Sequence, residues 1–352
     1  MDDRLALRAR SRRDAAPGTP ATPSRRLVRG LAWGTAALAV TVLASLLFGA
    51  GEVGPGRALA VLAGVGDDDA RFAVLQLRAP RTVVAVAVGT ALGVAGAVLQ
   101  TAARNPLAEP GLLGVSAGAS FAVVLVIASG ASAAALGPWV AVLGAGAGCL
   151  LALGAARLRG TGDDPVRLVL AGAALSGLLG AATSIVLLLD QRTADEVRFW
   201  TVGSVAGRDP GTLSQVGPVL AGGLVIALLA ARPLSALALG DTVAQGLGHR
   251  PARARGLAMA AVALLVGGSV AAAGPIAFVG LVVPFLARAL VGPDLRRVLA
   301  VAVLLGPAVV LAADVASRLL VRPYEMPLGV VTALIGAPVL VAVVRSTRMP
   351  SL

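Results

Sequence analysis

Two short segments interrupt the apolar runs of this chain, and they limit its possible folds more than any other feature. Residues 104–116 read Arg-Asn-Pro-Leu-Ala-Glu-Pro-Gly-Leu-Leu-Gly-Val-Ser, and residues 274–284 read Gly-Pro-Ile-Ala-Phe-Val-Gly-Leu-Val-Val-Pro. Backbone N–H and C=O groups find no water in hydrocarbon, so such breaks are tolerated only where protein covers them or where they line a cavity. Transporters keep their pathways at breaks of this kind. The pattern therefore favours a transport protein over a simple membrane anchor.

The composition is that of a polytopic membrane protein. Of the 352 residues, 57% are hydrophobic and only 14% are charged, whereas about a quarter of a soluble domain is charged. A membrane span needs about 20 apolar residues, or fewer inside a bundle, and ten segments qualify. They are residues 30–50, 81–101, 112–128, 137–156, 167–189, 215–231, 254–273, 276–291, 298–317 and 328–345. We therefore expect an all-helical integral membrane domain of about ten spans over residues 30–352.

Residues 1–29 are polar and carry eight arginines around a middle rich in proline, glycine and threonine. This composition predicts a disordered basic tail. A signal peptide fits less well, because the apolar run that follows is long and no clear cleavage site follows it. If the tail lies inside, the inner segments hold 21 arginines and the outer segments 9. The positive-inside rule then predicts that both termini are cytoplasmic.

Missing residue types exclude several chemistries. All 30 basic residues are arginine, so the chain has neither the lysine of a P-loop nor a Schiff-base lysine. One histidine, His249, and one cysteine, Cys149, cannot build a His/Cys metal cluster or a disulfide. We expect no catalytic residue, metal or cofactor in this chain, so any ATP must be hydrolysed by a partner. The net charge of +12 suggests nucleic acid, but with only 3% aromatic residues the chain lacks stacking platforms for bases.

A weak internal repeat accompanies the two breaks. The segments Gly93–Gly118 and Gly267–Arg288 each run from a glycine-rich helix through a Pro/Gly break into another helix. The predicted topology gives them opposite orientations. This arrangement indicates an inverted repeat of four or five spans, which is common in transporters.

Several motifs follow one another in a fixed order between residues 55 and 345. They are Leu77–Arg81, Gly96–Gln100, Asn105–Ala108, Gly114–Ala119, Trp200–Ser204, Leu239–Gly248, Gly274–Pro284, Ala313–Asp314 with Arg318, and Glu325–Pro338. With these motifs the chain resembles the FecCD-type permeases, the membrane subunits of ABC importers for iron–siderophore complexes, haem and cobalamin. The ten spans of that family, of the type II importer class, agree with the count made from hydropathy.

The resemblance implies a division of labour among several chains. Two permease subunits, identical or paralogous, form the pathway at their interface in the bacterial cytoplasmic membrane. Two cytoplasmic ATPases bind ATP and magnesium, and an extracytoplasmic binding protein or lipoprotein delivers the substrate. The mechanism would be alternating access. The expected substrate is a bulky metal chelate, in the first place a ferric siderophore, with haem and cobalamin left open.

The resemblance also assigns roles to three groups of residues. Segment 237–248 resembles the coupling helices that seat in a cleft of the ATPase, although an ordinary amphipathic loop is the alternative. Its expected coupling residues are Leu239, Gly240, Asp241, Ala244 and Gly248.

Two further groups lie at opposite ends of the spans. Arg78, Arg81 and Arg318 fall at the outer ends, where the family's arginines meet acidic residues of the binding protein; interfacial snorkelling is the alternative. Asn105 and Leu107 lie in the inner break and are expected to form part of a cytoplasmic gate. Asn105 could instead cap a helix that starts at the following proline.

Asp314 supports a rival function. It is the one carboxylate clearly within a predicted span, and such an acid is a functional candidate by default. An ion-coupled secondary transporter could use it, whereas a structural pair with Arg318, one helical turn later, would compete. An intramembrane enzyme would need clustered acids or histidines, which the sequence does not offer. The chain also departs from the family at Phe285, where histidine is frequent, and at Val339, where an aromatic residue is frequent.

Overall fold

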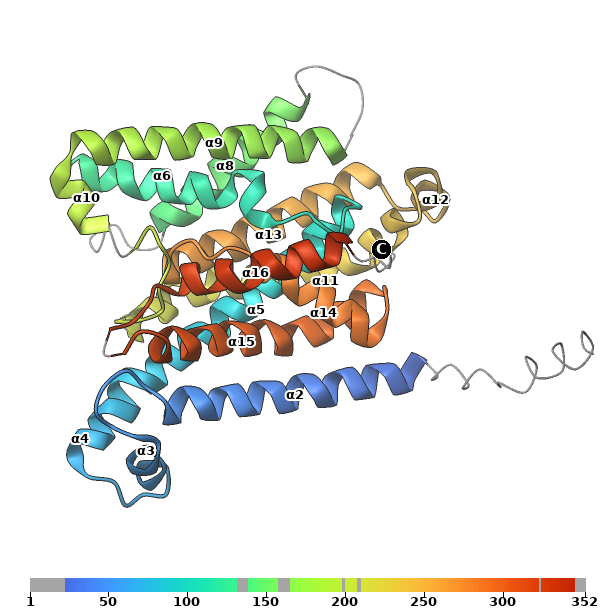
Figure 1. The fold of residues 1–352 in the computed structure, drawn as a ribbon. Coiled ribbons are helices and arrows are strands. Elements are labelled where there is room, and N and C mark those ends of the chain that lie inside the picture. Colours follow the sequence, from blue (N-terminus) through green and yellow to red (C-terminus); the bar gives the residue numbers. More distant parts are fainter. Residues whose placement is uncertain are drawn as a thin grey trace, which may run out of the picture.

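The computed structural model describes residues 23–131, 139–157, 165–197, 200–207, 210–322 and 324–345, and these form a helical bundle without a strand (Figure 1). Within them, seven helices are long and apolar enough to cross a membrane, and three shorter apolar helices accompany them. The long ones are α2 (Pro23–Leu47), α5 (Ala79–Ala102), α8 (Trp139–Arg157), α9 (Pro165–Leu189), α11 (Pro210–Ala238), α13 (Pro251–Ala273) and α15 (Leu295–Leu319). The short ones are α6 (Val115–Ala128), α14 (Val279–Val291) and α16 (Leu328–Arg345). The all-helical fold predicted from hydropathy is confirmed, with one helix for each predicted span.

Helix boundaries differ from the prediction where polar residues or prolines lie inside a helix. Residues 1–22 of the predicted tail lie outside the described part of the chain, and residues 23–29 already belong to α2. α11 continues to Ala238, past Arg232 and Pro233, although an Arg-Pro pair usually marks a helix end. The charge and the proline predict the end of a span at residue 231, whereas the helix continues through both of them.

Short elements connect the long helices at the two ends of the bundle. They are α3 (Pro55–Leu62), α4 (Asp68–Arg71), the π-helical η1 (Phe72–Arg78), the 3₁₀ turn η2 (Pro110–Leu113), α10 (Gln191–Val197) and α12 (Asp241–Gly246). α4, η1 and α5 follow one another without a gap, so α5 is entered through a polar, partly π-helical extension. Figure 1 shows the start of α2, α12 and the C-terminal end of α16 at one end of the bundle, and α3, α4 and α10 at the other.

α5 is the central helix of the bundle. Most of its apolar length is buried, whereas α2 and α9 expose most of theirs. It packs against α15, α13, α11 and α14. Where α5 meets α15, a Cβ on Gly89 would lie 2.6 Å from the carbonyl oxygen of Gly306. The two backbones therefore touch directly, which small residues permit in membrane helices.

The helix contacts support the predicted inverted repeat. If α5, α6, α8 and α9 correspond to α13, α14, α15 and α16, then the contact of α5 with α15 has its counterpart in that of α13 with α8. The contact of α5 with α14 likewise matches that of α13 with α6. The pairs α6–α8 and α14–α15, and α6–α9 and α14–α16, complete the correspondence. In Figure 1, α5 and α13 run in opposite directions along the bundle.

Candidate functional site

The two broken segments, far apart in the sequence, contact each other in the fold. The carboxylate of Glu109, in the first break, accepts a hydrogen bond from the backbone N–H of Phe278, in the second. Phe278 has a left-handed backbone (φ 67°) and directly precedes α14. Two residues further, a Cβ on Gly280 would lie 2.8 Å from Cδ of Pro110. Each break thus provides partners for the other, as non-helical backbone at membrane depth requires.

The predicted gate residues Asn105 and Leu107 lie in the turn that follows α5. The Asn105 side-chain oxygen accepts the Leu107 N–H at 2.9 Å, and the Asn105 N–H donates to the Gln100 carbonyl at 3.1 Å. No helix starts at Pro106, since the next helical turn begins at Pro110. Asn105 therefore caps a turn and not a helix, so the alternative reading of this motif is wrong.

Two hollows adjoin the breaks on the side of α16. Pro106 and Leu107 line a small apolar pocket together with Phe285 of α14 and Val339 of α16. A larger recess of about 530 Å³ is lined by both breaks and by α16. Its walls include Gly111, Ser116, Thr201, Pro275, Ala277 and Leu334. The recess is largely apolar with a few hydroxyl groups, which is the usual character of a ligand pathway or pocket.

The predicted coupling segment forms a short helix held by one carboxylate. Asp241, the first residue of α12, pairs with Arg104 and accepts hydrogen bonds from Arg255 of α13 at 3.0 and 3.1 Å. Arg104 also donates to the carbonyl of Leu237 at 2.8 Å. Because Arg104 lies in the first break, this cluster joins α12 to the breaks and to α13.

The remaining predicted coupling residues lie in α12 or directly beside it. Gly240 and Gly248, on either side of α12, have positive φ angles of 119° and 79°, which glycine adopts without strain. Ala244 is buried and attaches the helix to the bundle. Leu239 is 68% exposed, and Val243 and Leu247 are exposed on the same segment. α12 and the residues on either side of it therefore present an apolar surface. α12 lies at the end of the bundle where α2 begins (Figure 1).

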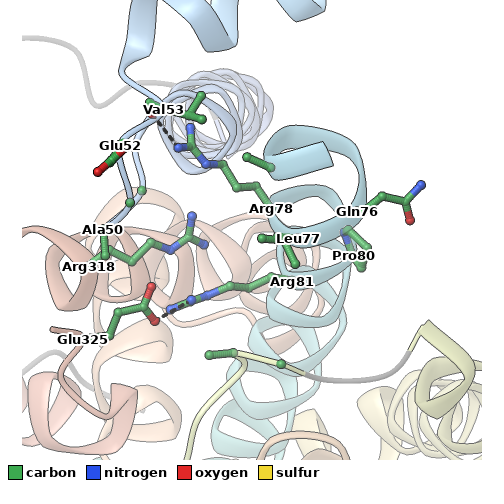
Figure 2. Close-up of a pocket in the computed structure, with 15 residues that line it drawn as sticks. Ala50, Glu52, Val53, Gln76, Leu77, Arg78, Pro80, Arg81, Arg318 and Glu325 are labelled. Atoms are coloured by element: carbon green, nitrogen blue, oxygen red, sulfur yellow. Dashed lines mark hydrogen bonds and ion pairs between the residues drawn. The ribbon is translucent and has the colours of Figure 1, made fainter. Parts of the chain in front are cut away.

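At the opposite end, the three predicted docking arginines line one cavity of about 540 Å³. Arg78 is buried and donates to the carbonyls of Leu46, Leu47 and Val53 at 2.7–3.0 Å. Figure 2 shows it pointing toward Val53. It therefore fixes the end of α2 and the loop that follows.

Arg318 and Arg81 meet at Asp314. Arg318 is 1% exposed, pairs with Asp314 and donates to the Ser45 carbonyl at 2.8 Å. The ion pair of Asp314 and Arg318, which the sequence analysis set against ion coupling by Asp314, is thus present. Arg81 binds Asp314 at 2.6 Å and Glu325 at 2.7 Å, and it faces Glu325 across the cavity in Figure 2.

Sequence reasoning missed Glu109, Glu325 and a buried polar pair. The side-chain oxygen of Gln100 in α5 accepts a hydrogen bond of 2.6 Å from Arg288 in α14, and both residues are buried. An arginine and a glutamine inside apolar segments were the available signal. Within the described ranges, no three His, Cys, Asp or Glu side chains gather as a metal-ligand group.

Together, the ten apolar helices, the facing breaks and the repeat define a multi-pass membrane permease. The FecCD transport family matches residues 37–346, and the chain belongs to that family. It is 44% identical over 310 residues to the ferric enterobactin transport system permease protein FepD of Escherichia coli, covering 88% of this chain and 92% of that protein.

Two other comparisons agree. The hemin transport system permease protein HmuU of Yersinia pestis is 38% identical over 271 residues, covering 75% of this chain and 80% of HmuU. A solved metal-chelate type ABC transporter in an inward-facing conformation matches with a TM-score of 0.71 and 30% identity, over 90% of this chain and 99% of that one.

Proposed function

We propose that this chain is the permease subunit of an ATP-driven importer that carries a ferric siderophore into a bacterial cell by alternating access between two permease subunits. The substrate class rests on the 44% identity to a ferric enterobactin permease over most of both chains. One structural observation carries the mechanism. Arg104, in the first break, pairs with Asp241 at the start of α12, so a movement of α12 is transmitted to the gate turn.

In this proposal, ATP and magnesium bind only to two cytoplasmic ATPase subunits. The apolar surface of α12, with Leu239 exposed, seats in a cleft of the ATPase. When the ATPases close, α12 shifts and carries Arg104, and the turn containing Asn105 and Leu107 moves against α14 and α16. The N-terminus, α12 and the C-terminal end of α16 then lie in the cytoplasm, in agreement with the arginine bias.

The cavity at the other end receives the substrate-binding protein. Arg78 donates to backbone carbonyls, and Arg318 binds the Ser45 carbonyl and Asp314, so both hold the shape of the rim. Arg81 provides the exchangeable charge, because its second partner Glu325 has a side chain 34% exposed. On docking, an acidic side chain of the binding protein takes the place of Glu325 at Arg81. Such complementary charges set orientation and association rate.

The ion-coupled alternative relies on Asp314, and the geometry does not favour it. Both oxygens of this fully buried carboxylate accept hydrogen bonds from arginine. A coupling acid must exchange its cation with the pathway during each cycle, whereas the two guanidinium groups here are parts of the fold. The position is better suited to holding α5 and α15 together.

Transport in proteoliposomes tests the proposal. The permease is reconstituted with the ATPase and binding protein encoded beside it, and uptake of iron-55 as a ferric catecholate siderophore is measured with ATP inside. We expect uptake only with ATP and all three components, and none with an ATPase that lacks its catalytic glutamate. Iron uptake driven by a proton gradient without ATPase would refute the importer mechanism. Transport of hemin in place of the siderophore would refute the substrate assignment alone.

A further inference from the structure

A groove between α11 and α15 is separate from the recess and the cavities described above. α11 packs mainly on α13 and α5, whereas α15 packs mainly on α5, α2 and α14, so the two helices flank a hollow of about 400 Å³. The groove is lined by Leu228, Leu229, Ala231, Arg232, Arg296 and Leu299. None of these residues lines the recess or the pocket beside the breaks.

The groove carries two positively charged side chains that form no ion pair within the described residues. Both guanidinium groups, of Arg232 and Arg296, are on exposed residues. Within the described ranges, neither has an ion-pair or hydrogen-bond partner. Asp294, the nearest acid in sequence, accepts the backbone N–H groups of Arg296 and Arg297 and so caps α15. Both guanidinium groups of the groove are therefore open to an anion.

Along the helix axis, the apolar surface lies toward the middle of the bundle and the charges lie toward its end. Leu228 and Leu229 are 65% and 66% exposed and lie one turn before Arg232. Arg232 is near the α12 end of α11, and Arg296 is in the first turn of α15 at the same end of the bundle (Figure 1). Toward the middle of the bundle the groove is thus apolar, and toward its end it is cationic. An amphiphile with an anionic head and an apolar chain has the same order.

We propose that this groove binds an anionic phospholipid of the phosphatidylglycerol type, with the phosphate between the two arginines and an acyl chain along the two leucines. Basic pockets between membrane helices on the cytoplasmic side are known to bind such headgroups. A free phosphate fits less well, because both arginines are exposed to water and a soluble ion gains nothing from the apolar surface of Leu228 and Leu229. The inference rests on the orientation of the proposed function, in which this end of the bundle is cytoplasmic, and does not depend on which chelate is transported.

Native mass spectrometry of the detergent-solubilised chain, titrated with phosphatidylglycerol or phosphatidylcholine, tests the proposal. We expect a preference for phosphatidylglycerol, and a loss of about 25-fold in apparent affinity in R232Q/R296Q, since each arginine near an anionic headgroup contributes about fivefold. The R232K/R296K variant keeps both charges and should retain most of the affinity. The control R253Q/R345Q removes two exposed arginines at the same end of the bundle and should bind like the wild type.

Three results would overturn the lipid site. R232Q/R296Q, monodisperse by size exclusion, could bind phosphatidylglycerol as the wild type does. Phosphatidylcholine could bind equally well, which would indicate an apolar groove without headgroup recognition. Finally, millimolar inorganic phosphate could displace phosphatidylglycerol, which would indicate a site for a soluble anion and not for a lipid.

Discussion

Replacing Asp314 by asparagine should destabilise the fold severely without creating a transport defect of its own. The carboxylate is fully buried and binds Arg81 at 2.6 Å in addition to Arg318. Asparagine has nearly the same shape but no charge, so two buried or nearly buried cations lose their shared anion. Breaking a buried ion pair from one side costs about 3–5 kcal/mol.

The contacts that Arg81 and Arg318 keep in D314N place the expected loss of stability at the lower end of that range. Arg81 keeps Glu325 at 2.7 Å, and Arg318 keeps the carbonyl of Ser45 at 2.8 Å, so neither cation is left without a partner. We therefore expect a loss of about 3–4 kcal/mol in the free energy of unfolding. At roughly 2 °C per kcal/mol for a chain of this size, the apparent Tm falls by about 6–8 °C.

The single cysteine provides the assay. Cys149 lies in α8 and is 5% exposed, so a thiol-reactive fluorescent dye labels it only when the bundle opens. Apparent Tm values are compared at one scan rate for the wild type, D314N and the control E325Q. Glu325 is partly exposed, and the loss of such a surface pair costs about 1 kcal/mol or less, or about 2 °C.

A second substitution separates charge from packing. In D314N/R318M the cation of α15 is removed together with its anion, so the two losses of stability should not add, with a coupling energy of about 2 kcal/mol. A wild-type Tm for D314N, or strictly additive losses in the double variant, would refute the view that Asp314 is a structural anchor. If D314N kept its Tm but lost a pH-dependent uptake, Asp314 would be a coupling acid.

Three further predictions concern the breaks. R104Q should lower the ATP hydrolysis stimulated by the binding protein about tenfold and leave the Tm almost unchanged, measured with the assembled importer. G96V should reduce the yield of folded protein, because a Cβ there lies 2.6 Å from backbone carbon of Gly280, whereas G177V, with open space around it, should fold normally. Burial raises the pKa of Glu109 above its ordinary value of 4.5, so the folded chain holds this proton more tightly than the unfolded one. Stability should decline as pH rises from 4.5 through the folded-state pKa, and this component should be absent from Tm measurements on E109Q.

The helices could be predicted because the bilayer imposes a length and a composition on them. Each predicted span contains a helix, and the errors are local. α11 continues past Pro233, because one missing backbone N–H is tolerated inside a packed bundle. α5 is preceded by the π-helical extension Phe72–Arg78, which polar residues around Asp68 hid from a hydropathy count. Neither error moved a helix to another place in the fold.

The partners of the charged residues could be predicted only where they share a helix. The pair of Asp314 and Arg318 follows from their spacing of four residues. Arg81 reaches Asp314 across 233 positions of sequence, and Glu109 reaches Phe278 across 169. Such contacts depend on how the two halves of the repeat are packed, and no local pattern in the sequence encodes that packing.

The two positions at which the sequence departs from the family pattern also meet only in the fold. Phe285 and Val339 are far apart in sequence, yet both line the small apolar pocket beside Leu107. The aromatic ring of Phe285 and the small side chain of Val339 therefore fill one contact together. Neither residue lines the recess between the breaks and α16, where Ser116 and Thr201 supply hydroxyl groups. The two departures therefore lie beside the turn of Leu107 and outside the recess.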